Sequence, residues 1–246
     1  MRGLRMMKNH VKQFKTIPRV VVVGAAGGGL DRWRQWAMMG QIKGAGFEPD
    51  PIECGNLRKA YPFAEFHQFA LGDKSGPVKL YVTSSPQCTS CLEPDIETLA
   101  PYSASSLFKV EKTEQVTLRR FDELCKEGVV SVPHFLQADV QGFEYNVMEG
   151  FGSYLDDLVG IEVESHFINL YNGQKTLWQI IDFLKSHGFV LRHLETQGPF
   201  GGELVEVNAF FSRLLKSDEK EKRSLVKIWE LVCALPHYEG TREGLI

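Results

Sequence analysis

The sequence has no long apolar run and no large excess of charge. None of its hydrophobic segments approaches the roughly 20 residues that a helix needs to cross a bilayer, and its N-terminus lacks the apolar core of a secretion signal. The net charge of −3 gives no electrostatic argument for nucleic-acid binding. We therefore expect a cytoplasmic protein without a transmembrane segment or a nucleic-acid partner.

Cysteine is also scarce. Five cysteines without regular spacing in 246 residues indicate a reducing compartment rather than a disulfide framework. Cys88 and Cys91 form the only CxxC pair, and neither a second pair nor a His-x-x-x-His motif accompanies it to complete a zinc site. We expect no metal in this protein.

Basic residues gather at the N-terminus, ahead of the first acidic residue, Asp31. They are Arg2, Arg5, Lys8, Lys12, Lys15 and Arg19. A solvated arm over residues 1–18 would account for them, as would contact with an anionic partner or a membrane surface.

What the sequence does contain is a strand, a glycine turn and a helix in succession. Four valines, 20–23, run into the glycine-rich segment 24–29, and an amphipathic segment, 30–38, follows. This order is typical of a buried parallel strand that ends in a ligand-binding turn. Glu48, at the end of a second apolar strand, is placed to accept hydrogen bonds from a ribose diol. Together they predict a nucleoside cofactor site, although a turn needed only for close strand–helix packing is the alternative.

Strand and helix signals alternate along most of the chain, which predicts an α/β fold with a mostly parallel sheet and helices on both faces. The predicted strands cover residues 19–24, 45–48, 66–71, 135–140, 158–164 and 189–194. The predicted helices cover residues 30–39, 51–60, 120–126, 143–148 and 176–187. A turn cluster at 197–202 joins the last of these strands to another at 206–212, so the sheet should end in a C-terminal antiparallel hairpin.

Two further segments depart from this alternation. Short extra strands are expected at 76–83 and 114–118, and the segment 83–106 between them holds 12 Ser, Thr or Pro among its 24 residues. A connection that long suggests an ordered flap over the ligand, with a loose surface loop as the alternative. The tail, 214–246, has a helical pattern with an apolar stripe that would pack on the main domain, 19–213, or form a homodimer.

Polar side chains follow two of the predicted buried strands. Asp139 and Gln141 emerge where one strand ends, at the edge where open α/β sheets bind ligands, and Glu144 follows within one helical turn. Asp139 is a candidate catalytic group, with a helix N-cap as its alternative role. Glu164 and His166 end the next strand near the same rim, where a histidine beside carboxylates can act as a general base. An ordinary surface histidine is the other interpretation.

These motifs, taken in order, resemble the FkbM-type S-adenosylmethionine-dependent methyltransferases. The matching segments are 22–28, 47–49, 70–76, 138–144 and 161–164, and the resemblance covers roughly residues 19–213. It implies a Rossmann-like class I methyltransferase fold, with a seven-stranded sheet whose last strand is antiparallel. It also implies S-adenosyl-L-methionine as cofactor and a hydroxyl on a small molecule, sugar or glycan as acceptor.

The resemblance further implies roles for individual residues. The cofactor-binding residues would be Gly24, Ala25, Ala26, Gly28, Glu48, Pro49, Leu71, Gly72, Asp139 and Gln141. The catalytic candidates are Asp139, His166, Glu164 and Glu144.

The chain departs from the family's usual residues at three positions. The family's first motif usually has Asp and Asn where this chain has Val22 and Ala26, and its Asp-Val-Glu-Gly motif has Gln141 here in place of Glu. A protein that keeps the fold but only binds or scaffolds is therefore the alternative to O-methylation. NAD-dependent oxidoreduction is a weaker third reading, because the glycine spacing is irregular for a dinucleotide site.

Overall fold

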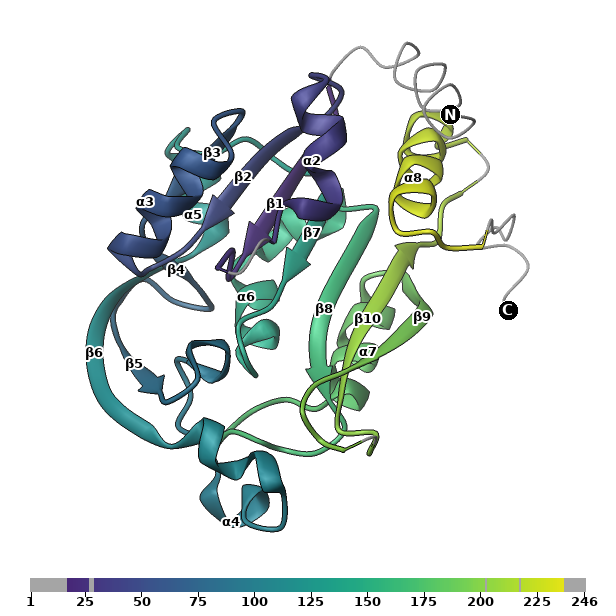
Figure 1. Cartoon of the computed structure of the whole chain (residues 1–246). Helices are drawn as coiled ribbons and strands as arrows, with labels where there is room; N and C mark the ends of the chain where they lie inside the picture. The colour runs from purple at the N-terminus through teal and green to yellow at the C-terminus, as the bar shows by residue number, and fades with distance from the viewer. Residues whose placement is uncertain (1–16, 27–28, 202, 217, 237–246) are drawn as a thin grey trace.

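The computed structural model describes residues 17–26, 29–201, 203–216 and 218–236. Its centre is a seven-stranded sheet in the order β3-β2-β1-β7-β8-β10-β9 (Figure 1). The strands are β1 (Arg19–Val23), β2 (Lys43–Phe47), β3 (Ala64–His67), β7 (Phe135–Ala138), β8 (Gly160–His166), β9 (Phe189–Gln197) and β10 (Glu206–Arg213). The first five are parallel, and β10 pairs antiparallel with both β8 and β9. The predicted parallel sheet and its terminal hairpin are confirmed.

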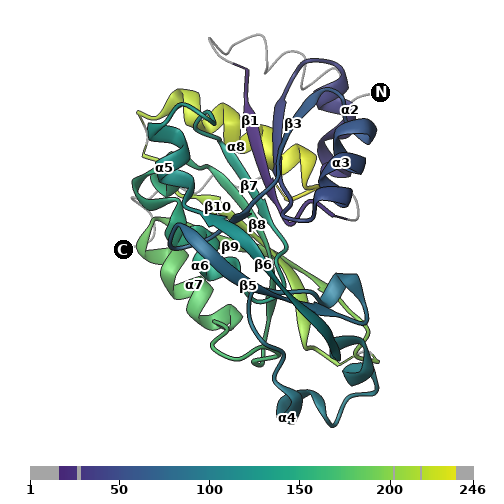
Figure 2. The ribbon, with the colours of Figure 1, turned by 90° about the vertical axis from the view of Figure 1, so that its left-hand side faces the viewer.

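Helices cover both faces of this sheet (Figure 2). On one face lie α2 (Asp31–Met38), α3 (Pro51–Ala60) and α8 (Lys220–Val232), and on the other α5 (Phe121–Lys126), α6 (Glu144–Gly150) and α7 (Leu177–Ser186). The valines of β1 explain why both faces are covered: Val21 and Val23 pack into one core, Val20 and Val22 into the other, and none is more than 2% exposed. Such continuous burial is characteristic of a central parallel strand.

The predicted strand over residues 66–71 is wrong in one respect, because it divides between two sheets. β3 ends at His67, and the next two strand residues form β4 (Ala70–Leu71) in a separate sheet with β6 (Val110–Arg119) and β5 (Gly76–Thr83). The backbone of β4 pairs with the last residues of β6, which draws the chain away from β3. The two extra strands predicted beside the main sheet are therefore the long β5–β6 hairpin.

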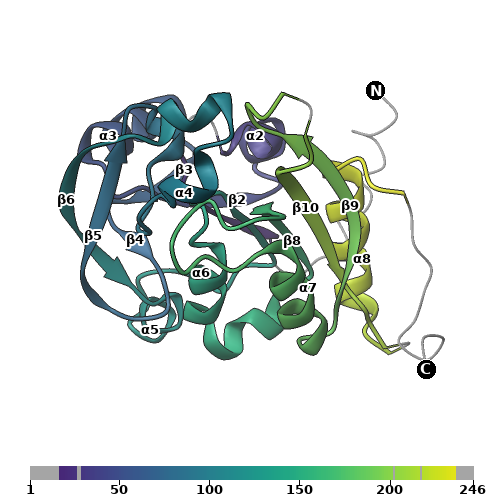
Figure 3. The ribbon, with the colours of Figure 1, turned by 90° about the horizontal axis from the view of Figure 1, so that it is seen from below.

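The segment between β5 and β6 lies beyond the carboxyl ends of the parallel strands (Figures 1 and 3). It contains the short helices η1 (Pro86–Cys88), α4 (Ile96–Leu99) and η2 (Ser103–Phe108). Its apolar residues form a small core with Tyr171 and Phe200 from other parts of the chain. The polar segment is thus anchored to the domain at the edge that the sequence indicated.

The tail helix α8 packs on the chain's own sheet. Trp229 is fully buried and stacks on Trp33 and Phe135 at ring distances of 6.0 and 5.9 Å. The apolar stripe that suggested a homodimer is therefore used within the chain, and the dimer stays a prediction. No helix in the described part of the chain is long and apolar enough to cross a membrane.

Candidate active site

Residues at the ends of five strands lie at the carboxyl edge of the parallel strands. Gly24 follows β1, Glu48 follows β2, Asp139 follows β7 and His166 ends β8. Because β10 runs antiparallel, its first residue, Glu206, lies at the same edge, paired with His166. This is the edge at which open α/β sheets bind their ligands.

The glycine turn brings the loops after β1 and β7 together. Gly24 has a φ of 73°, and a Cβ at this position would lie 1.8 Å from the carbonyl oxygen of Asp139. Only glycine combines this backbone conformation with so close an approach. Ala25 is fully buried, Ala26 is exposed, and Gly28 lies outside the described residues.

Glu48 is fixed beneath this turn. Its Oε2 accepts a hydrogen bond from the backbone N–H of Ala26 at 3.2 Å, and its Oε1 accepts one from Asp50 at 3.0 Å. Burial raises the pKa of Glu48, and these two bonds oppose the rise. Each oxygen keeps a lone pair that a ribose hydroxyl could use, but Glu48 is only 6% exposed, so the ribose contact stays a prediction. Pro49, between Glu48 and the helix cap Asp50, is half-buried.

Aromatic rings that the sequence analysis did not select adjoin Glu48. Phe47 lies 5.1 Å from the ring of His67 and 5.6 Å from that of Phe69. Phe69 is partly exposed, and His67 Nε2 is buried without a hydrogen-bond partner. Treating 66–71 as one strand hid them, because Phe69 lies in the break between β3 and β4.

Leu71 and Gly72, predicted to lie beside adenine, are enclosed instead. Leu71 is 1% exposed in the core, and a Cβ on Gly72 would meet the Phe143 ring at 2.8 Å. The contact with adenine stays a prediction.

The loop after β7 is held from beneath by Glu144. Gln141 and Gly142 have φ values of 54° and 90°, and Glu144 Oε1 accepts the backbone N–H groups of Val140 at 2.9 Å and Gly142 at 3.2 Å. Glu144 is fully buried, and burial raises its pKa to about 8. Glu144 shapes the loop from inside the protein. Its side chain does not reach the surface, so its catalytic role stays a prediction without support from the geometry.

Gln141 joins two of the candidate catalytic carboxylates. Its Nε2 donates to Asp139 Oδ1 at 3.1 Å and to Glu164 Oε2. The Tyr171 hydroxyl donates to Gln141 Oε1 at 3.0 Å, and Ser90 Oγ donates to the Gln141 carbonyl at 2.7 Å. The residue that replaces the family's usual glutamate therefore supplies N–H donors between two acids, where a third carboxylate would repel both.

Asp139 and Glu164 form a coupled pair of acids. Asp139 is an exposed residue. The protein around its carboxyl nevertheless removes part of the solvent and raises its pKa, and hydrogen bonds from Gln141 and Glu164 oppose the rise. Burial also raises the pKa of Glu164 well above its usual range, and the charge of Asp139 adds to the effect. The two neighbouring carboxyls therefore disfavour each other's ionisation. An acid or base with a raised pKa is thus available at the sheet edge.

His166 is buried, and its tautomer is fixed by Gln174. Gln174 Oε1 accepts the backbone N–H groups of Leu170 and Tyr171, so Gln174 Nε2, 2.6 Å away, donates to His166 Nδ1. Neutral His166 then carries its proton on Nε2, which lies 3.5 Å from Glu206 Oε2. In this tautomer His166 has no free lone pair for a substrate, so its role as general base stays a prediction and the geometry favours Asp139.

Glu206 is the residue at this edge that the sequence analysis missed. It is 8% exposed and begins β10 opposite His166. A signal was present, because a strand that returns antiparallel to β8 must start where β8 ends.

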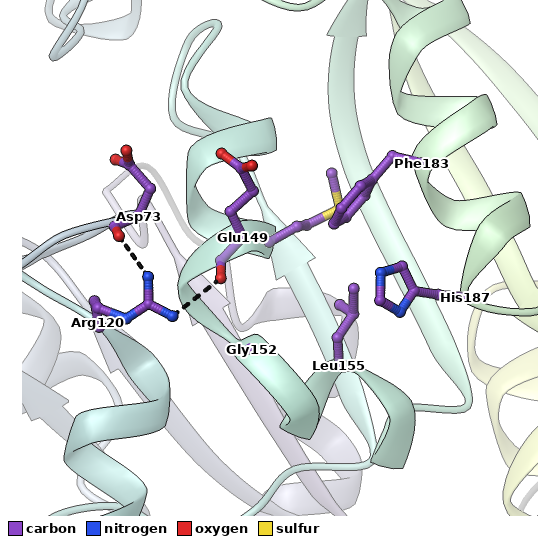
Figure 4. Close-up of a pocket in the computed structure, with 8 residues that line it drawn as sticks. Asp73, Arg120, Glu149, Gly152, Leu155, Phe183 and His187 are labelled. Atoms are coloured by element: carbon purple, nitrogen blue, oxygen red, sulfur yellow. Dashed lines mark hydrogen bonds between the residues drawn. The ribbon is translucent and has the colours of Figure 1, made fainter.

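A separate cavity of about 430 Å³ lies among α5, α6 and α7, on one face of the sheet (Figure 4). It is lined by Asp73, Arg120, Met148, Glu149, Gly152, Leu155, Phe183 and His187. Figure 4 shows the Arg120 guanidinium already bonded to the carbonyls of Asp73 and Glu149. Asp73, which the resemblance implies to lie beside the adenine with Leu71 and Gly72, is the one residue of the predicted site in its lining, so the sheet edge is the better candidate for the active site.

A family model described as the methyltransferase FkbM domain matches residues 23–191. A search of curated proteins found no match.

Several solved structures are similar to this chain. Magnesium protoporphyrin IX methyltransferase from Synechocystis PCC 6803, with bound S-adenosylmethionine, has 11% identity and a TM-score of 0.42, over 86% of this chain and 78% of that one. Fibrillarin from Aeropyrum pernix, with natively bound S-adenosylmethionine, has 13% identity and a TM-score of 0.41, over 79% of this chain and 67% of that one. A TehB-like methyltransferase from Corynebacterium glutamicum has 10% identity and a TM-score of 0.36, over 86% and 87%.

The family model covers well over half of the chain, and the strand order with its antiparallel β10 is the one that the resemblance implied. The chain therefore belongs to the FkbM family of S-adenosylmethionine-dependent methyltransferases and has the class I methyltransferase fold.

Proposed function

We propose that this protein transfers the methyl group of S-adenosylmethionine to a hydroxyl oxygen of a sugar, a glycan or a secondary metabolite. The observation that carries the proposal is the coupled pair Asp139 and Glu164, bridged by Gln141 and placed directly beside the glycine turn. Transfer to a hydroxyl is helped by a group that takes its proton, and a carboxyl whose pKa is raised is a better base for this purpose.

The residues present fit the cofactor in two respects. Gly24 lets the loop after β1 meet the carbonyl of Asp139, so the glycine turn and Asp139 lie side by side at the predicted cofactor site. Glu48 is held by two backbone N–H groups, which keep its carboxylate at the edge of the sheet as an acceptor for ribose hydroxyls. When bound, S-adenosylmethionine supplies an activated methyl group on a sulfonium.

The chain itself supplies orientation and proton removal. The acceptor hydroxyl would lie against Asp139, which takes its proton as the oxygen–methyl bond forms and the methyl–sulfur bond breaks. Holding the two reactants in line can lower the barrier by about 7–11 kcal/mol, and a positioned base adds about 10²- to 10⁴-fold. Glu164 is the second candidate, because it shares hydrogen bonds with Asp139.

The experiment separates binding from turnover. Calorimetry measures the affinity for S-adenosylmethionine, and transfer of labelled methyl to a panel of hydroxylated sugars and metabolites measures activity. Asp139→Asn should keep cofactor binding within about threefold and lower transfer at least a hundredfold. Glu65→Gln, which removes an exposed carboxylate on β3, is the matched control. Full turnover by Asp139→Asn would show that Asp139 is not the base.

A binding or scaffolding role without catalysis is the second candidate. It is favoured by Val22, which stands where the family usually has an acid and is 1% exposed in an apolar core. The Val22 methyls would lie 2.6 Å from a Cβ on Gly29, so this part of the turn is packed rather than polar. No heat of binding at millimolar S-adenosylmethionine would favour the scaffold.

A further inference from the structure

Two glutamates and a histidine meet between β8 and β10, next to Asp139. The antiparallel register pairs His166 with Glu206, and Glu164 lies two residues before His166 on the same face of β8. One carboxylate oxygen from each glutamate and a ring nitrogen of His166 all lie within 4.8 Å of one another. Glu164, His166 and Glu206 are 7%, 0% and 8% exposed.

The two glutamates have no basic side chain to balance them. Among the described residues, neither forms an ion pair with a lysine or arginine. The ionisable group facing Glu206 Oε2 is His166 Nε2, 3.5 Å away. Arg32, on the same side of the sheet, is already engaged by Glu162 at 3.2 Å and Glu195 at 3.9 Å. Buried carboxylates are costly unless they are paired or coordinate a cation.

The imidazole of His166 gives a second, independent indication. It is fully buried, its Nε2 has no hydrogen-bond partner, and this atom points toward Glu206 Oε2 at 3.5 Å. Gln174 fixes the tautomer with the proton on Nε2. Carboxylates that ligate metals are commonly oriented by such a buried donor behind them.

We propose that Glu164 and Glu206 bind a divalent cation of the Mg²⁺ or Mn²⁺ class, with the Nε2–H of His166 orienting Glu206. Oxygen ligands suit these ions, which are commonly held by one or two carboxylates and keep several positions for water or substrate. An ion about 2.1 Å from two oxygens holds them about 3.0 to 4.2 Å apart. In the structure one oxygen from each glutamate lies within 4.8 Å of the other, close to this range.

The open positions of the ion would take oxygens of the acceptor, and this part of the inference rests on the proposed function. A coordinated hydroxyl is oriented and made more acidic by the ion, which acts as a Lewis acid without changing oxidation state. Its proton would pass to Asp139, which lies outside the cluster of Glu164, His166 and Glu206. The acceptor class is then one with a second oxygen near the methylated hydroxyl, as in a vicinal diol.

The test uses the full chain without cofactor and Mn²⁺ as the probe. Electron paramagnetic resonance of free Mn²⁺ gives the stoichiometry and dissociation constant, and Mg²⁺ should compete. We expect one Mn²⁺ per chain, at least tenfold weaker binding in Glu206→Gln and no change in Glu203→Gln. Glu203 is exposed three residues away, so this control removes the same charge. Circular dichroism checks the folding of each variant. If Glu206→Gln does not fold, Glu164→Gln is used in its place.

The orienting role of His166 has its own readout. His166→Gln, whose amide nitrogen can still donate toward Glu206, should bind Mn²⁺ more tightly than His166→Ala. Equal affinity of these two variants overturns the orienting role. No Mn²⁺ binding to the wild type at millimolar concentration, or equal binding by wild type and Glu206→Gln, overturns the site.

Failure of the metal proposal can be told apart from failure of the proposed function. If hydroxyl methylation is observed and survives chelation with EDTA, the metal is not needed for it. If Mn²⁺ binds at this site but no hydroxyl acceptor is methylated, the site stands and the proposed function fails.

Discussion

Replacing Gln141 by glutamate tests how the acids of this site are held together. Glutamate keeps the acceptor that receives the Tyr171 hydroxyl, but it loses the N–H groups donated to Asp139 and Glu164. It also places a third carboxylate between the other two. The change is isosteric, so its effect reports electrostatics rather than packing.

The expected loss of stability follows from these contacts. A hydrogen bond to a charged group contributes about 1.5–3 kcal/mol, and two are lost. Solvent reaches Asp139 and screens part of this loss. We therefore expect Gln141→Glu to lower the free energy of unfolding by about 3 kcal/mol at pH 8.

The loss should depend on pH in a defined direction. The folded-state pKa values of Asp139 and Glu164 are already raised, and a third carboxylate raises them further. A carboxyl whose pKa is raised by folding does not affect stability below its unfolded pKa of about 4. As pH rises above that value toward its folded pKa, it lowers the free energy of unfolding increasingly. The difference between variant and wild type should therefore be much smaller at pH 5 than at pH 8.

Urea unfolding followed by tryptophan fluorescence at the two pH values measures this difference. Gln115→Glu, an exposed position on β6, is the matched control and should change stability by less than about 0.5 kcal/mol. A loss that is the same at pH 5 and pH 8, or absent at both, would refute the reasoning.

Three further predictions concern the loops and the core. Gly24→Ala should weaken S-adenosylmethionine binding at least tenfold in calorimetry, because the added Cβ would lie 1.8 Å from the Asp139 carbonyl and push the two loops apart. The control is Gly40→Ala, at a φ of 64° with open space around it. It should lower the free energy of unfolding by only about 1 kcal/mol and leave binding unchanged. Because the pKa of Glu144 is raised to about 8 in the folded protein, the wild type should lose stability as pH rises from about 4.5 toward 8. Glu144→Gln should reduce this loss, since the amide does not titrate and its oxygen can still accept both loop N–H groups. An unchanged pH profile in urea unfolding contradicts this. Gly160→Ala should lower the free energy of unfolding by about 1–3 kcal/mol, because its Cβ would lie 2.3 Å from the indole of α8, and Gly55→Ala, in open space on a helix, should not destabilise the protein.

Anchoring of the flap explains how a distant segment can affect the site. The Tyr171 hydroxyl contacts both the Cys88 carbonyl and Gln141 Oε1 at 3.0 Å, and Ser90 Oγ donates to the Gln141 carbonyl. The flap therefore supports the loop that carries Asp139. The CxxC cysteines in it are free, and burial raises their pKa values to about 11 and about 12, which argues against a reactive thiol.

The sequence by itself determined the layered fold and pointed to one edge of the sheet for the candidate site. The β1 valines require cover on both faces, and the turn at 197–202 requires an antiparallel return. Glu48 and Asp139 could be placed at the ligand edge, because each directly follows a buried strand. These are local signals, carried by residues that are neighbours in the chain.

Only the tertiary structure decided how the polar groups at that edge are paired. The segment 66–71 divides because β6, more than 40 residues away, offers the backbone partners for β4. Gln141 reaches Glu164 across 23 residues, and His166 gains Glu206 as its neighbour through the register of β10 with β8. Which carboxyl keeps a proton and which ring nitrogen carries one depend on desolvation and hydrogen bonds between separate strands, and a linear pattern of residue types does not contain these quantities.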